Sequence, residues 1–143
     1  MADLLANHPP YARWAHVLLR IFAAAIILEH GAQKMFGAFG GMGGAGQPVH
    51  FVSLYGLAGV IELTCGTLVF LGLFTRPAAF IISGEMAVAY FLVHVKRGFW
   101  PILNRGEIVV LLCFVFLYFA ATGAGAISLD YIRTRRRPQP VMR

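Results

Sequence analysis

Four long apolar segments constrain the fold of this chain more than any other feature. They cover about residues 12–36, 51–74, 77–95 and 106–121, and each is near the roughly 20 residues that a helix needs to cross a bilayer. Only 13% of the residues are charged and the mean hydropathy is +0.72, which is too apolar for a soluble core of this size. We therefore predict an all-α, integral membrane four-helix bundle, with residues 1–143 forming a single domain.

The distribution of basic residues predicts the orientation in the membrane. Four crossings place both termini on the same side, where Arg13, Arg76 and the basic C-terminal tail 131–143 would gather. Lys and Arg are enriched in cytoplasmic loops, so both termini are expected in the cytoplasm. The basic residues of the loop 96–105 would then lie outside, against this preference, which suggests that they have another role. No basic region precedes a short apolar core, so the first segment is expected to be a retained anchor.

Polar side chains near the outer ends of these segments are the candidate functional residues. Ionisable groups are costly at membrane depth, so they usually face a protein interior, a partner or a water-filled cavity. Helical spacing puts His30, Gln33 and Lys34 on one face, and His94 and Arg97 on another. We predict a polar pocket near the outer membrane face, beneath the glycine-rich loop 37–48 and the loop that carries Trp100. Its candidate residues are His30, Gln33, Lys34, Glu62, His94, Arg97 and Glu107.

Each candidate also has a purely structural interpretation. Lys34 and Glu62 could form a buried ion pair, and each histidine could bind a backbone carbonyl. Glu107 could be a charge favoured at the N-terminus of a helix. Glu85 lies nine residues before His94, so an ideal helix would place the two on opposite sides, with Glu85 in a separate, deeper contact.

The chemistry of the predicted pocket favours a quinone over a metal or haem. Imidazole and ammonium groups can donate hydrogen bonds to quinone carbonyls, and a nearby carboxylate can pass protons. Two histidines and Glu107 could instead ligate a metal or haem, but no CxxCH or HExxH motif is present. Cys65 and Cys113 form no CxxC pair, and we expect both to be small buried apolar residues. A quinone is thus the candidate ligand, haem is disfavoured, and no metal site is predicted.

An ordered set of short motifs resembles the DoxX family of small bacterial membrane proteins. No single motif is specific, but the set runs in order over roughly residues 18–130. One departure is Asn104-Arg105-Gly106-Glu107, where Gly-Gly-Glu is common in the family. The matching pieces are Leu19-Arg20, His30-Gly31-Ala32-Gln33-Lys34-Met35-Phe36-Gly37, Glu62-Leu63, Leu71-Gly72-Leu73-Phe74-Thr75-Arg76-Pro77, Gly84-Glu85-Met86-Ala87-Val88-Ala89-Tyr90-Phe91, Val93-His94, Gly98-Phe99-Trp100-Pro101, Gly106-Glu107 and Ser128-Leu129-Asp130.

The resemblance implies a multi-pass protein of the bacterial inner membrane. The family takes its name from thiosulfate:quinone oxidoreductase subunits, and some members are linked to redox-stress complexes. The resemblance implies a small subunit with a quinone-linked or redox-associated role, for example as a membrane subunit of a quinone-linked oxidoreductase. It does not imply that the chain itself catalyses a reaction. A thiosulfate site is not supported, because no reactive thiol motif is present.

The alternative is a non-catalytic accessory subunit that packs in a larger respiratory or photosynthetic membrane complex. Small residues such as Gly56 and Gly59 on the apolar segments suit such helix docking. A small transporter or channel is a third class, but no inverted repeat supports it. The expected partners are membrane lipids and other membrane protein subunits. Nucleic acid is not expected, since no folded basic domain accompanies the tail.

Overall fold

The computed structural model describes residues 9–135, and all regular structure within them is helical, which confirms the all-α prediction. Three helices are long and apolar enough to cross a membrane: α1 (Pro10–Phe36), α2 (Leu54–Leu71) and the combined segment Thr75–Arg97. That segment comprises α3 (Thr75–Ala89), a π-helical turn η2 (Tyr90–His94) and a 3-10 turn η3 (Val95–Arg97). A fourth apolar helix, α5 (Glu107–Thr122), is shorter. The remaining helices are η1 (Ala38–Gly40), α4 (Pro101–Asn104) and α6 (Leu129–Arg135).

Local sequence signals determine where the first two long helices begin and end. Pro10 occupies the first turn of α1, where its missing N–H costs nothing, and Gly37 ends the helix in the left-handed conformation (φ 68°). The Ser53 side chain caps α2 by accepting a hydrogen bond from the Gly56 N–H, and left-handed Gly72 ends it. For this reason α2 spans Leu54–Leu71 rather than the expected residues 51–74.

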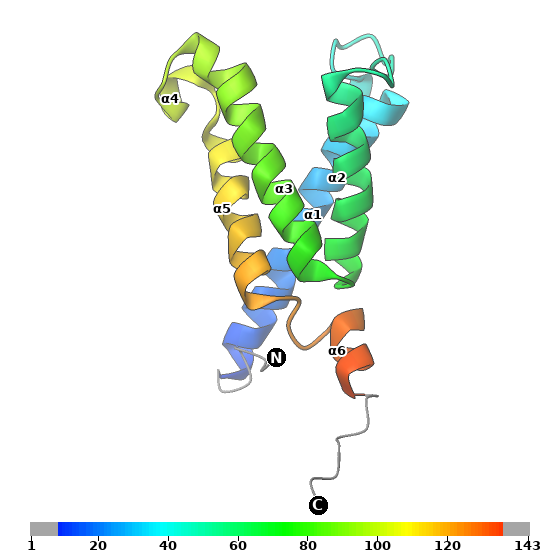
Figure 1. The fold of residues 1–143 in the computed structure, drawn as a ribbon, viewed down its shortest axis with the longest axis vertical. Coiled ribbons are helices and arrows are strands. Elements are labelled where there is room, and N and C mark those ends of the chain that lie inside the picture. Colours follow the sequence, from blue (N-terminus) through cyan, green and yellow to red (C-terminus); the bar gives the residue numbers. More distant parts are fainter. Residues whose placement is uncertain (1–8, 136–143) are drawn as a thin grey trace, which may run out of the picture.

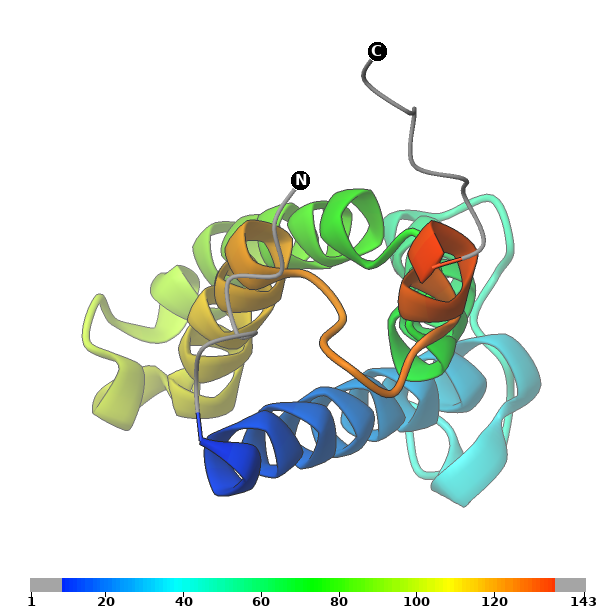
Figure 2. The same ribbon diagram turned by 90° about the horizontal axis from the view of Figure 1, so that it is seen from below.

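The four long helices form two pairs that splay apart into a V. α1 packs along α2, and α3 packs along α5, as Figure 1 shows. The two pairs meet at the narrow end of the V, where the α2–α3 turn lies. The first turns of α1 and the short helix α6 also lie at this end (Figures 1 and 2). The glycine-rich loop and α4 lie at the opposite, wide end.

Glycines allow α1 and α2 to approach closely. A Cβ built on Gly31 of α1 would lie 2.9 Å from the Leu63 side chain and 3.1 Å from the Cβ of Glu62. A Cβ on Gly59 of α2 would lie 2.9 Å from the Met35 side chain. Small residues at such crossings are the usual means by which membrane helices pack tightly. This close crossing brings the C-terminal end of α1 against α2.

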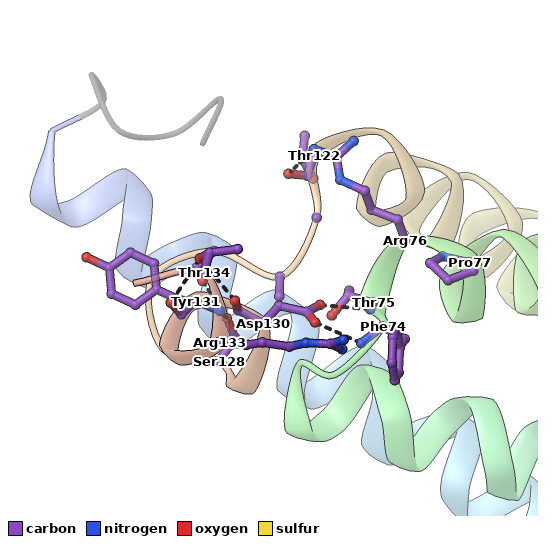
Figure 3. Close-up of a pocket in the computed structure, with 13 residues that line it drawn as sticks. Phe74, Thr75, Arg76, Pro77, Thr122, Ser128, Asp130, Tyr131, Arg133 and Thr134 are labelled. Atoms are coloured by element: carbon purple, nitrogen blue, oxygen red, sulfur yellow. Dashed lines mark hydrogen bonds between the residues drawn. The ribbon is translucent and has the colours of Figure 1, made fainter. Parts of the chain in front are cut away.

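The segment after α5 folds back and closes the narrow end. The Asp130 carboxylate accepts hydrogen bonds from the backbone N–H groups of Phe74 and Thr75, at 3.0 Å each, and so caps α3 (Figure 3). Arg20 does not reach back to the membrane surface as a snorkelling side chain would. It is 2% exposed, and its guanidinium donates a 2.7 Å hydrogen bond to the Ile127 carbonyl. The folded-back segment covers it.

Part of the predicted basic tail is therefore helical. Residues 131–135 belong to α6, whereas residues 136–143 lie outside the described part of the chain. Figure 3 shows a pocket of about 440 Å³ beside α6, into which two basic side chains reach. Arg76 donates to the Thr122 carbonyl at 3.3 Å, and the Arg133 guanidinium lies 5.0 Å from the centre of the Phe74 ring. The first contact attaches the end of α5 to the start of α3, and the second attaches α6 to it.

Candidate functional site

A cavity of about 540 Å³ lies between the two helix pairs, toward the wide end of the V. Residues of α1, α2, α3, η2 and α5 line it, and most of them are apolar. This volume and this mixture of an apolar wall with a few polar groups are typical of small-molecule sites. Its ionisable lining residues are His30, Lys34, Tyr55, Glu62, Glu85 and His94.

A buried ion pair forms one polar wall of the cavity. The Lys34 Nζ of α1 lies 2.5 Å from both carboxylate oxygens of Glu62 on α2. The side chains are only 13% and 2% exposed, respectively. A charge-assisted pair with both oxygens engaged satisfies most of the bonding capacity of Glu62. The pair both joins α1 to α2 and places a cation and an anion beside the cavity.

Glu85 of α3 lines the same cavity but lacks such a partner. Its Oε2 is buried and makes no hydrogen bond. It lies close enough to Lys34 and Glu62 for their charges to act on it, yet the Lys34 ammonium is already held by Glu62. A buried polar atom without a partner is costly and is uncommon in folded proteins. Glu85 therefore offers an unused hydrogen-bonding oxygen to whatever occupies the cavity.

The two predicted histidines approach the cavity from opposite helix pairs. His30 is an exposed residue of α1, one helical turn before Lys34. His94 ends η2, and its Nδ1 lies 3.2 Å from the Asn104 carbonyl oxygen, to which it can only donate. Its ring also stacks on Tyr90, with the ring centres 6.3 Å apart. The His94 ring is thus held in place, with Nε2 as its remaining nitrogen.

Three of the seven predicted residues do not line the cavity. Gln33 donates a 3.4 Å hydrogen bond to the Gly41 carbonyl and so contacts the glycine-rich loop. Arg97 is exposed at the end of η3, where the chain leaves the bundle. Glu107 is exposed in the first turn of α5, where a negative charge favours the helix. The structure thus brings together His30, Lys34, Glu62 and His94, but not Gln33, Arg97 or Glu107.

The expectation that Glu85 and His94 lie on opposite sides of their helix is wrong. Both line the cavity, and the segment that joins them is not an ideal α-helix, because it ends in the π-helical turn Tyr90–His94. Its wider turn changes the rotation per residue relative to an α-helix, and single π turns are frequent at functional sites. No motif in the sequence signals this turn, so spacing alone could not place Glu85 in the site.

Asn104 holds the loop beside this turn. It is fully buried, and its side-chain amide donates to the Gly98 carbonyl at 2.6 Å and to the Tyr90 hydroxyl at 3.3 Å. Its Oδ1 accepts from the Gly106 N–H at 2.8 Å. The Tyr90 hydroxyl donates in turn to the Phe99 carbonyl. These bonds fix the loop above the cavity, so Asn104 has a structural role here.

Neither a thiol pair nor a metal cluster accompanies the cavity in the described part of the chain. Cys65 and Cys113 are free thiols. Within residues 9–135, no group of three or more His, Cys, Asp or Glu side chains is arranged to hold a metal ion.

Long apolar helices around a polar-walled cavity define a multi-pass helical membrane protein with a small-molecule-sized internal site. The family model described as DoxX matches residues 15–95. The chain belongs to the DoxX family, which confirms the resemblance inferred from its motifs.

Full-length relatives agree with this assignment. A Haemophilus influenzae protein is 44% identical over 131 residues, which cover 87% of this chain and 94% of that protein. A Mycobacterium tuberculosis protein, named as a membrane protein, is 31% identical, with 93% of this chain and 87% of that protein covered. A Bacillus subtilis protein named "Putative oxidoreductase CatD" is 32% identical, with 80% of this chain and 83% of that protein covered. No solved structure matches this chain.

Proposed function

We propose that this protein is a bacterial inner-membrane subunit with a quinone-linked redox role, and that its cavity binds the quinone head group. The observation that carries the proposal is the meeting of the Lys34–Glu62 pair and the unpartnered Glu85 oxygen in one apolar cavity of about 540 Å³. A quinone ring is apolar on its faces and carries hydrogen-bond acceptors at its edge, so it fits such walls. The oxidoreductase name of the Bacillus subtilis relative agrees with a redox role.

The lining residues suit the two forms of a quinone. A bound quinone would supply reversible transfer of electrons coupled to protons. His30 and Lys34 can donate hydrogen bonds toward a ring carbonyl, and the free Glu85 oxygen can accept one from a ring hydroxyl. The Lys34–Glu62 pair keeps a donor and an acceptor fixed beside the ring. The chain's own part is to bind, orient and hold protons, while a partner subunit supplies the electrons.

The proposed orientation places the cavity near the outer membrane face. Arg76 lies at the narrow end of the V, as do the first turns of α1, which carry Arg13. Cytoplasmic enrichment of basic residues assigns this end to the cytoplasm. The wide end, with the cavity and the uncharged glycine-rich loop, then faces outward.

The proposal is tested by extracting the protein gently from its own membrane and measuring the quinone bound per chain. We expect the unaltered protein to retain quinone and His30→Ala to lose most of it, because His30 lines the cavity. His50→Ala is the matched control, since His50 is exposed and lies outside the cavity lining. Finding no more quinone than in an unrelated membrane protein of similar size, purified alongside, would overturn the proposal.

An accessory role is the second candidate, and the splayed helix pairs favour it. The gap at the wide end of the V could receive an apolar helix of a larger complex, which would then cover the cavity. In that case the same gentle extraction should recover a stoichiometric protein partner and no quinone. Both His30→Ala and His50→Ala should then leave the complex intact.

A further inference from the structure

The cavity has exposed apolar walls as well as polar groups. Several of the apolar residues that line it are exposed rather than buried within the bundle. Leu57 of α2 is 58% exposed, Val88 of α3 is 51% exposed and Leu92 of η2 is 44% exposed. Toward the wide end, α2 and α3 diverge, and these residues come from the two helices that border the gap (Figure 1). The cavity is therefore continuous with the lipid-facing surface.

One face of α3 leads from this opening to the polar groups. Val88, Glu85 and Ile81 of α3 line the cavity at spacings of three and four residues, and Leu92 of the adjoining π-helical turn η2 lines it beyond Val88. Such spacing places residues on one side of a helix. On α2, Leu57 and Ile61 likewise precede and flank Glu62 along the cavity wall. A molecule that moved along these faces would pass apolar side chains first and reach carboxyl groups afterwards.

The carboxyl groups at the end of this path are not equivalent. Both oxygens of Glu62 are bound by Lys34, whereas Oε2 of Glu85 is buried without a partner. A ligand gains most binding free energy by a hydrogen bond to the unpaired Glu85 oxygen, because this oxygen is already desolvated in the unliganded protein. Glu85 is therefore the group that selects for a polar head.

We propose that the cavity takes its ligand sideways from the bilayer, through the gap between α2 and α3, with its polar ring leading until it hydrogen-bonds to Glu85. The ligand class is a lipid-soluble molecule with a polar ring and an apolar chain, and the chain remains between α2 and α3. This inference rests on the proposed function, since it assigns the path and the recognition residue of the same quinone site.

The experiment measures binding of decylubiquinone to the full-length protein in lipid nanodiscs. Glu85→Leu removes the hydrogen bond that a protonated Glu85 would donate to a quinone carbonyl and should raise the dissociation constant about tenfold, whereas Glu85→Gln keeps a donor, its amide N–H, and should stay within about threefold. Leu57→Trp narrows the gap and should slow association about tenfold. Leu111→Trp is its control, because Leu111 is 58% exposed on α5 and does not line the cavity. Infrared difference spectra should show a carboxyl band that shifts on binding and disappears in Glu85→Gln.

The possible failures can be told apart. If the unaltered protein does not bind decylubiquinone, the proposed function fails and this inference fails with it. If it binds, but Glu85→Leu and Leu57→Trp behave like the unaltered protein, the proposed function stands and the path and the role of Glu85 are overturned. If Glu85→Leu does not fold, the carboxyl band of the unaltered protein decides: a band that does not shift on binding overturns the role of Glu85.

Discussion

Replacing Lys34 with methionine should destabilise the protein by about 3 kcal/mol, because it leaves the charge of Glu62 buried without its partner. Glu62 is 2% exposed, and both of its oxygens are bound to the Lys34 ammonium. Methionine retains much of the apolar length of lysine, so the loss is mainly that of the compensating cation. The change in the free energy of unfolding can be measured by equilibrium unfolding of the purified protein in mixed detergent micelles.

Removing both charges should restore most of this loss. The Lys34→Met, Glu62→Leu double variant has no uncompensated charge, and apolar replacement of a buried ion pair is often close to neutral in stability. We therefore expect the double variant to be more stable than either single variant, which a double-mutant cycle detects. Additive losses in the double variant would show that the two side chains do not act as a pair.

Enlarging Gly31 to leucine should separate α1 from α2 and cost about 3 kcal/mol, the upper part of the range for overpacking. A Cβ at this position would already lie 2.9 Å from the Leu63 side chain, 3.0 Å from the Leu63 backbone nitrogen and 3.1 Å from the Glu62 Cβ. The backbone atom cannot move without moving α2. Since Glu62 lies at this contact, the ion pair and the cavity wall should be disturbed together, so quinone retention should fall as well.

Gly84 provides a control with the same chemical change. It is exposed on α3, and a Cβ built on it meets nothing within 4 Å. Gly84→Leu should therefore keep both the unfolding free energy and the retained quinone close to those of the unaltered protein. Equal losses of unfolding free energy in Gly31→Leu and Gly84→Leu would mean that the close α1–α2 crossing does not stabilise the protein.

The positions of the helices can be predicted from the sequence because they depend on local sequence features. Apolar segments of membrane-spanning length marked all four, and Pro10, Gly37 and Gly72 mark positions where the structure begins or ends a helix. The polar residues of α1 and α2 were predictable for the same reason, since Lys34 and Glu62 are costly in lipid and need a partner. The pairing of Lys34 with Glu62 depends on the close helix crossing at Gly31. In the sequence, only the small residues on these segments indicate such a crossing.

The parts that could not be predicted depend on contacts between distant segments. Ideal helical spacing separates Glu85 from His94, whereas both line the cavity in the structure, where a π-helical turn interrupts that spacing. The burial of Arg20 depends on the segment that follows α5, which folds back over it and supplies the Ile127 carbonyl. The sequence predicts Arg97 and Glu107 at the same membrane depth as the site, but both are exposed in the structure. The depth of a residue does not determine the direction in which its side chain points.

Photolabelling with an azido-substituted quinone tests the central claim most directly, because it reports where the ring lies. The protein is labelled in native-lipid nanodiscs, digested, and its labelled peptides are identified by mass spectrometry. We expect labels on the cavity-lining parts of α2 and α3, near Leu57, Glu85 and Val88, and we expect unlabelled decylubiquinone to prevent them. Labels spread over lipid-facing residues of α5 such as Leu111 and Phe114, undiminished by the competitor, would contradict a quinone site in this cavity.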